Sequence, residues 1–188
     1  TVKIVRTMPN TPALIGEGVT AYCYDEIQIS NEEICDFKTY FGSFGKLVNM
    51  NEHLMPAVVA ATGSSPAYVY MFIEAMADAA VSFGMPRAMA YEMVAQAVKG
   101  SAQMVLETGK HPGELKDAVT SPGGTTIKAV LAMEEAGFRN GVIKGIKVGN
   151  TKITTMVDGI SKTIDLTVVP NGDKVYFIDT FSSVSDAS

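Results

Sequence analysis

The segment Val119–Thr126 carries the residue types best suited to binding a charged small molecule. It reads Val-Thr-Ser-Pro-Gly-Gly-Thr-Thr and precedes a run with helical spacing. Glycines let a ligand approach the backbone, and the first turn of a helix offers free N–H groups at the positive end of its dipole. Such a segment can bind an anion, most simply a carboxylate or phosphate, through Gly123, Gly124, Thr125 and Thr126. The alternative is an ordinary capping loop in which Thr125 caps its own helix.

Two other segments have a composition that permits close approach of a ligand or of another part of the chain. Met8–Pro12 must be a rigid loop, because its two prolines lack backbone donors and bias their predecessors to extended geometry. Within it, Asn10 either reads a ligand amide or phosphate, or holds the turn through its own side chain. Gly63–Tyr68 places small residues before an apolar helix, which fits tight helix packing as well as a site.

The remaining reactive residue types are few and poorly spaced for catalysis. Two histidines, His53 and His111, lack metal-ligand spacing, and the two cysteines, Cys23 and Cys35, form no CxxC pair. The sequence contains no G-x-G-x-x-G and no Walker A motif. We therefore expect no bound metal and no dinucleotide fold built from this chain by itself. With no export signal, we expect a reduced, cytoplasmic protein.

The overall composition indicates a soluble globular protein of one domain, or of one domain with a small appendage. The chain has 188 residues, of which 47% are hydrophobic and 19% charged. Its net charge of −5, with 15 basic and 20 acidic residues and no basic cluster, argues against a nucleic-acid partner. Glu74 and Asp78 interrupt the longest apolar run, so we expect no membrane span.

The elements that must position these segments fall into three regions. Residues 1–50 predict short mixed structure, with a capping box formed by Ser30 and Glu33. The next region, rich in alanine and methionine, predicts helices over 51–62, 66–83, 87–106, 112–119 and 125–136. The 66–83 helix is apolar on nearly every side, so other helices or a second subunit must cover it.

From Val142 onward the composition changes to β-branched residues and turn pairs. Alternation over 163–168, with Asp158-Gly159 and Asn171-Gly172 as hairpin turns, predicts three or four antiparallel strands within 142–181. We expect 182–188 to be a frayed polar tail. The expected fold class is therefore mainly α, with a small β-rich C-terminal segment.

Taken together, these segments resemble pyrroline-5-carboxylate reductase over about residues 2–139. Pro112–Glu134 fits that family's signature along its whole length, and this is a highly specific match. Arg6–Pro12 resembles the loop after the last strand of the family's nucleotide domain. Thr62–Tyr68 resembles its Ser-Gly-Ser-Gly-Pro-Ala-Tyr segment, with Ser65 in place of a glycine.

The resemblance implies a domain organisation. Residues 51–139 would be the helical substrate-binding and dimerisation domain, like the family's C-terminal domain, and 1–50 the end of its nucleotide domain. The family carries an N-terminal Rossmann domain, so NADP or NAD would be bound mainly by a domain absent from this chain. The family also usually ends in one more helix after residues 137–139, where we expect the β-rich appendage over 142–181 instead.

The resemblance also implies an activity and site residues. The family reduces 1-pyrroline-5-carboxylate to L-proline, the last step of proline biosynthesis, and forms homodimers or higher homo-oligomers. Thr125 and Thr126 would contact the substrate, with the Thr126 hydroxyl reaching the ring nitrogen as the catalytic contact. Gly123, Gly124 and Glu52 would complete the substrate site. Met8, Pro9 and Asn10 would edge the cofactor pocket.

Two other functions remain compatible with the sequence. The chain could be a non-catalytic dimerisation module that lacks its cofactor domain, or a ligand-binding protein that senses proline without turnover. The preference between NADPH and NADH stays open, because the residues that read the ribose would lie in the absent domain.

Overall fold

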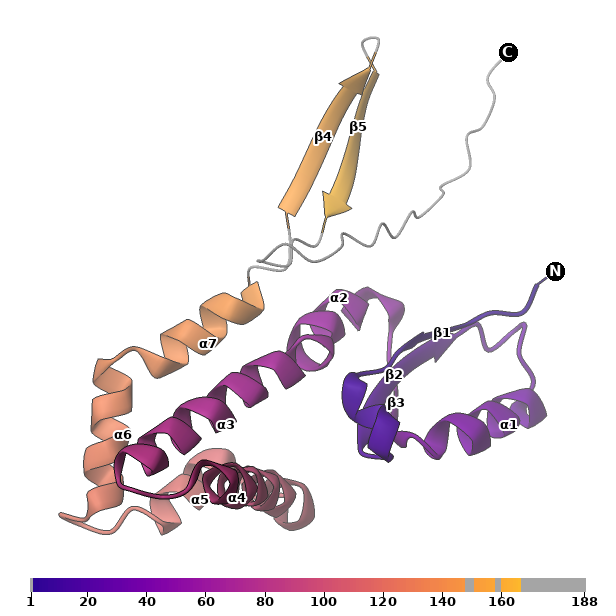
Figure 1. The fold of residues 1–188 in the computed structure, drawn as a ribbon. Helices are drawn as coiled ribbons and strands as arrows, with labels where there is room; N and C mark the ends of the chain where they lie inside the picture. The colour runs from indigo at the N-terminus through magenta and orange to yellow at the C-terminus, as the bar shows by residue number, and fades with distance from the viewer. Residues whose placement is uncertain (1, 148–150, 158–159, 167–188) are drawn as a thin grey trace, which may run out of the picture. The chain divides into compact units, whose positions relative to one another are not determined.

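The computed structural model describes residues 2–147, 151–157 and 160–166. They belong to two compact units, residues 1–132 and 133–188, which are considered separately below. Figure 1 shows a small sheet with one helix in the first part of the chain, then a run of helices, then a two-stranded hairpin. The expected mainly α fold with a β-rich C-terminal segment is confirmed.

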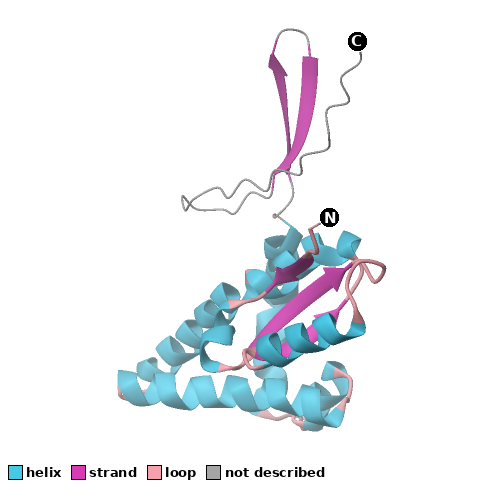
Figure 2. Cartoon of the chain, turned by 90° about the vertical axis from the view of Figure 1, so that its right-hand side faces the viewer, coloured by secondary structure: helices cyan, strands magenta, loops and turns pink. Residues whose placement is uncertain are grey.

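The N-terminal sheet has three strands in the order β1-β2-β3. β1 (Val5–Met8) pairs antiparallel with β2 (Gly18–Tyr24), which pairs parallel with β3 (Gly45–Asn49). A 3₁₀ helix, η1 (Thr11–Ile15), connects the first two strands. The parallel pair needs a crossover, which α1 (Asn31–Gly42) supplies, and Figure 2 shows this helix against the sheet.

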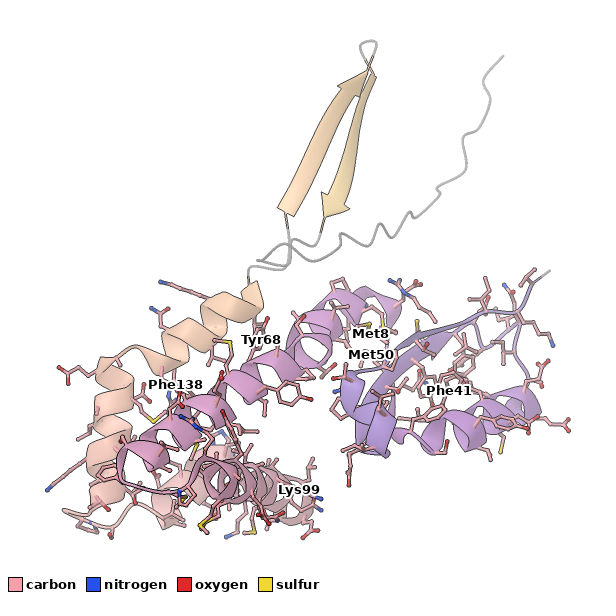
Figure 3. All side chains as sticks on the ribbon, in the orientation of Figure 1. Met8, Phe41, Met50, Tyr68, Lys99 and Phe138 are labelled. Atoms are coloured by element: carbon pink, nitrogen blue, oxygen red, sulfur yellow. The ribbon has the colours of Figure 1, made fainter. Side chains whose placement is uncertain are left out.

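The start of α1 confirms the predicted capping box. The Ser30 hydroxyl accepts from the Glu33 N–H at 3.3 Å, and a Glu33 carboxylate oxygen accepts from the Ser30 N–H at 2.9 Å. Side chains of α1 then cover the sheet: the Phe37 ring lies 5.1 Å from that of Tyr22 in β2, and Phe41 stacks on Phe37 at 4.5 Å. Phe41 is labelled in Figure 3, at the side of α1 that faces the strands.

Two facing glycines let β2 and β3 begin side by side. Gly18 pairs with Gly45, and a Cβ on Gly45 would lie 2.0 Å from the Gly18 carbonyl oxygen. The φ of Gly45 is +133°, which side chains rarely adopt. No other residue type fits at position 45 without moving the strand.

The helix predicted over 51–62 is wrong as a single element. The structure has a 3₁₀ turn, η2 (Glu52–Leu54), a short α2 (Met55–Val58) and a π-helix, η3 (Val59–Gly63). The N-cap position of η2 falls on Asn51, but its side chain makes no capping hydrogen bond. Pro56 lies in the first turn of α2, where its missing N–H costs least, and so separates α2 from η2.

The four helices after η3 agree with the sequence prediction to within about two residues. They are α3 (Ser65–Ser82), α4 (Arg87–Thr108), α5 (Pro112–Ala118) and α6 (Thr125–Glu135). α3 and α4 pack against each other. Gly137 follows α6 with a φ of +78°, the left-handed conformation in which glycine commonly ends a helix.

The predicted replacement of the last family helix by strands is wrong for residues 142–147. The structure has a helix there, α7 (Phe138–Lys147), whose apolar Phe138, Val142 and Ile146 recur every fourth residue. The β-branched content of this stretch favoured strands, but its helical period prevailed.

The predicted antiparallel strands are found further along the chain. β4 (Thr151–Val157) and β5 (Ile160–Leu166) form an antiparallel pair in which Val157 lies opposite Ile160. The turn predicted at 158–159, any further strand over 167–181 and the tail at 182–188 lie outside the described residues.

Candidate functional site

The loop between α5 and α6 turns tightly just before the first turn of α6. Gly123 has a φ of +70°, and the Gly124 N–H donates to the Ser121 carbonyl at 3.1 Å, which closes a turn immediately before α6. Thr125 and Thr126 are exposed in the first turn of α6. Among the described residues, neither hydroxyl has a hydrogen-bond partner, so both are available to a ligand.

Contacts at both ends of α5 hold this loop in place. At the start of α5, the Gly113 N–H donates to His111 Nδ1 at 3.0 Å, so His111 caps the helix. At its end, the Thr120 hydroxyl donates to the carbonyls of Lys116 and Asp117, both at 3.1 Å. His111 therefore has a structural role that its sequence context did not reveal.

The two other small-residue segments singled out in the sequence lie against each other. The Asn10 side-chain amide donates to the Thr62 carbonyl at 3.3 Å, and its oxygen accepts from the Val19 N–H at 2.9 Å. A Cβ on Gly63 would lie 2.6 Å from the Met8 methyl, so Met8 packs directly on that glycine. Figure 3 shows Met8 beside Met50, at the end of the sheet next to α2.

Glu52 makes an ion pair that sequence analysis missed. Arg6 Nη1 lies 2.6 Å from Glu52 Oε1, and both side chains are largely exposed, at 42% and 67%. Burial, reinforced by the charge of Glu52 and opposed by that of Arg6, raises the pKa of the Cys23 thiol. A raised pKa favours the thiol of Cys23 over the more reactive thiolate.

The candidate residues thus form two groups. The first comprises Met8, Pro9, Asn10 and Glu52, together with their partners Arg6, Thr62 and Gly63; the second comprises Gly123–Thr126. No hydrogen bond recorded for the described residues joins the two groups. Within the described part of the chain, no cluster of three or more His, Cys, Asp or Glu side chains lies close enough to hold a metal ion.

The exposed surface of α3 and α4 is unusually apolar. On α3 the exposed large side chains are Tyr68, Val69, Tyr70, Met71 and Met76, and on α4 they are Met89, Tyr91, Met93, Met104 and Leu106. An open groove of about 510 Å³ is lined by Ala67, Tyr70, Met71, Ile73, Glu74 and Tyr91. In the described residues, no helix has the length and apolarity needed to cross a bilayer.

Comparison with known proteins places these features in one family. The family model described as "Pyrroline-5-carboxylate reductase dimerisation" matches residues 52–156, which extends beyond the resemblance seen in the sequence and includes α7. The pyrroline-5-carboxylate reductase of Escherichia coli is 53% identical over 161 residues, covering 86% of this chain and 58% of that protein. The Synechocystis enzyme is 44% identical over 144 residues, covering 77% of this chain and 54% of its own length.

Solved structures agree with the sequence comparison. Pyrroline carboxylate reductase of Plasmodium falciparum, with NADP bound, superimposes with a TM-score of 0.71 at 36% identity, covering 77% of this chain and 58% of that one. The Streptococcus pyogenes enzyme gives 0.72 at 36% identity, covering 78% and 56%. The chain spans little more than half the length of these relatives. Because the family model alone matches more than half of its residues, the chain belongs to the pyrroline-5-carboxylate reductase family, with residues 52–156 matching the dimerisation region.

Proposed function

We propose that this chain is the substrate-binding and dimerising part of a pyrroline-5-carboxylate reductase. The whole enzyme reduces 1-pyrroline-5-carboxylate to L-proline with NADPH or NADH, in the cytoplasm. The observation that carries this proposal is the start of α6, where two exposed threonine hydroxyls without partners among the described residues follow a two-glycine turn. Membership of the family supports it.

The substrate is a flat five-membered imine that carries a carboxylate. In our proposal the N–H groups of Thr125 and Thr126 and the helix dipole bind the carboxylate, and Gly123 keeps the approach to the backbone open. Thr125 adds a second hydroxyl to the site. The Thr126 hydroxyl faces the ring nitrogen and, through a hydrogen bond, favours the protonated iminium form.

In our proposal the Met8–Asn10 segment edges the cofactor pocket. Met8, Pro9 and Asn10 would flank the nicotinamide, and Glu52, fixed by Arg6, would face the substrate. These residues form no glycine-rich cradle for a diphosphate, so a further domain of the whole enzyme must hold NADP or NAD. When bound, the nicotinamide supplies the hydride that reduces the imine carbon. The contribution of this chain is to fix the substrate in the orientation for that transfer.

Replacing Thr126 with valine tests the proposed substrate contact. The test protein carries the dinucleotide-binding domain of a relative before Thr1. A hydrogen bond to a charged or charging group contributes about 1.5–3 kcal/mol, so we expect Thr126→Val to lower kcat/KM by about tenfold to a hundredfold. Steady-state kinetics with 1-pyrroline-5-carboxylate measure the effect, and an unchanged melting temperature shows that the fold survives.

The matched control is Thr39→Val, which removes a hydroxyl bonded only to its own helix, at the Cys35 carbonyl. If the folded Thr126→Val enzyme equals this control in kcat/KM, the α5–α6 loop is a capping loop and not the substrate site. The substitution Gly124→Val is a less suitable test of the same site. A Cβ on Gly124 would lie 2.6 Å from Ser121 Oγ, so the substitution disturbs the loop itself.

The chain by itself is expected to be inactive, because none of its motifs holds a dinucleotide. NADPH oxidation by the 188-residue chain well above a blank would contradict this. Saturable proline binding without turnover, in the chain and in the extended protein alike, would favour the ligand-binding alternative. An oligomer that neither oxidises NADPH nor binds proline would favour the alternative of a non-catalytic dimerisation module.

A further inference from the structure

Asn10 uses both ends of its side-chain amide inside the protein. Its oxygen accepts from the Val19 N–H of β2, and its nitrogen donates to the Thr62 carbonyl of η3. Both bonds are partly shielded from solvent. An amide engaged in this way has its main hydrogen bonds inside the protein, so its chemistry points to a different role from ligand binding.

The Thr62 carbonyl cannot accept the usual α-helical hydrogen bond, because the residue four positions later has no N–H group. In a continuing α-helix it would accept from the N–H four residues later, but position 66 is proline, which has none. Just before the proline, the Ser64 N–H donates to the carbonyl five residues earlier, that of Val59, at 3.0 Å, and not to the carbonyl four residues earlier. This bond is typical of the π-helix. Thr62 is left to accept from Asn10 and from the Ser65 hydroxyl at 3.2 Å.

Gly63 makes the second contact at the same junction. Without a Cβ it lets the Met8 methyl pack directly on the backbone of η3. Met8 and Asn10 lie on either side of Pro9, so the two contacts together fix both ends of the Met8–Asn10 segment.

We propose that Asn10 is a positioning residue that seats the Met8–Asn10 segment on the last turn of η3. Pro66 leaves the Thr62 carbonyl without its α-helical donor, and the Asn10 amide, together with the Ser65 hydroxyl, donates to it instead. The Asn10 bond thereby fixes the sheet against the helices at this junction. That this segment edges the cofactor pocket rests on the proposed function, whereas the seating itself does not.

Hydrogen exchange of two backbone amides in the 188-residue chain distinguishes the two hydrogen bonds of Asn10. The Val19 N–H donates to Asn10 directly, whereas the Ser64 N–H donates within η3 and reports on the helix whose Thr62 carbonyl accepts from Asn10. Asn10→Ala removes both, so we expect the Val19 and Ser64 amides to exchange about tenfold faster than in the parent. Asn10→Asp keeps an acceptor for Val19 but, as a carboxylate, has no donor for Thr62. Only Ser64 should then exchange faster.

The aspartate variant also has a diagnostic pH profile. A protonated carboxyl group again presents one acceptor and one donor, so protection of Ser64 should return as the pH falls below about 4, the ordinary aspartate range. A side chain that merely fills space would show no such recovery. Each variant is compared with the parent at the same pH, which removes the intrinsic pH dependence of exchange.

The matched control is Asn51→Ala, because Asn51 makes no side-chain capping bond. It should leave both amides unchanged. The ε-methyl NMR signal of Met8, assigned through Met8→Leu, reports the seating directly and should shift in Asn10→Ala but not in Asn51→Ala. Ser64 exchange within twofold of the parent in both Asn10 variants, or a Ser64 rate in Asn10→Asp that does not recover in acid, would overturn the proposal. No substrate or cofactor is used, so this outcome is independent of the proposed function.

Discussion

At the scale of single residues, Glu33 shows how one carboxylate connects two parts of the chain. It completes the capping box with Ser30 and accepts from Lys3 Nζ with both oxygens, at 2.6 and 2.8 Å. The Lys3 hydrogen bonds, followed by those of Ser30, lower the pKa of Glu33 to about 2. The capping box follows from sequence spacing, whereas the partner 30 residues away does not.

Glu33→Gln should lower the melting temperature at pH 7 and have little effect in strong acid. A carboxyl with a depressed pKa stabilises the fold above its unfolded pKa, near 4.5, and loses that effect as the pH falls towards 2. Glutamine keeps the capping-box geometry, so the difference reports the charged interaction. Thermal melts between pH 7 and pH 2 measure it.

The matched control is Glu32→Gln, since Glu32 lies in the same first turn without the Lys3 contact. If Glu33→Gln and Glu32→Gln follow the same curve, the helix dipole accounts for the effect and Lys3 does not.

At the scale of elements, the short helix α5 depends on its cap to present the α5–α6 loop. Seven residues are too few for a helix to be stable alone. His111 Nδ1 accepts from the Gly113 N–H, which requires that this nitrogen be unprotonated. Lys110 and Glu114 add an exposed ion pair at 2.9 Å, a contact of little energetic weight.

His111→Ala should destabilise the chain by about 1 kcal/mol, the usual value for one hydrogen bond. In a chain of this size that corresponds to a fall in melting temperature of about 2–4 °C. His111→Asn places a short acceptor at the same cap and should recover most of the loss. His53→Ala, at an exposed histidine without a capping bond, is the control; equal losses in both alanine variants would show that the cap is unimportant.

At the scale of the whole molecule, the exposed face of α3 and α4 requires a cover. Its exposed tyrosines and methionines lie on two helices that pack together, where an apolar patch marks an interaction site, and the family model that matches this region is one of dimerisation. We expect the cover to be a second copy of the chain, in a homodimer or a higher homo-oligomer.

Met71→Asp should break this assembly without unfolding the protomer, because Met71 is 67% exposed. A two-fold interface contains each substitution twice, and a buried methionine contributes about 1.5–3 kcal/mol. The dissociation constant of the dimer should therefore increase by about a hundredfold or more. Light scattering across a concentration series measures it. The control is Leu14→Asp, at a 90% exposed position in η1. A parent chain that is a stable monomer at low micromolar concentration would refute the expectation.

Features that depend only on neighbouring residues can be predicted from the sequence. The capping box at Ser30, the extents of α3 to α6 and the glycine stop at Gly137 follow from local spacing and backbone chemistry. The glycine–threonine turn before α6 was also predicted, because its residue types act within one turn of the chain. The strand prediction over 142–147 is wrong, because the helical period of Phe138, Val142 and Ile146 outweighs the β-branched composition of this stretch.

Hydrogen bonds between groups that are distant in the sequence become evident only in the folded structure. Asn10 bonds to Thr62 across 52 residues, and Arg6 pairs with Glu52 across 46. A local pattern shows that Pro66 removes a donor, but not which side chain replaces it. That depends on how β1 and η3 come together when the chain packs, because hydrogen bonds between remote segments follow from the path of the whole backbone and leave no periodic signal in the sequence.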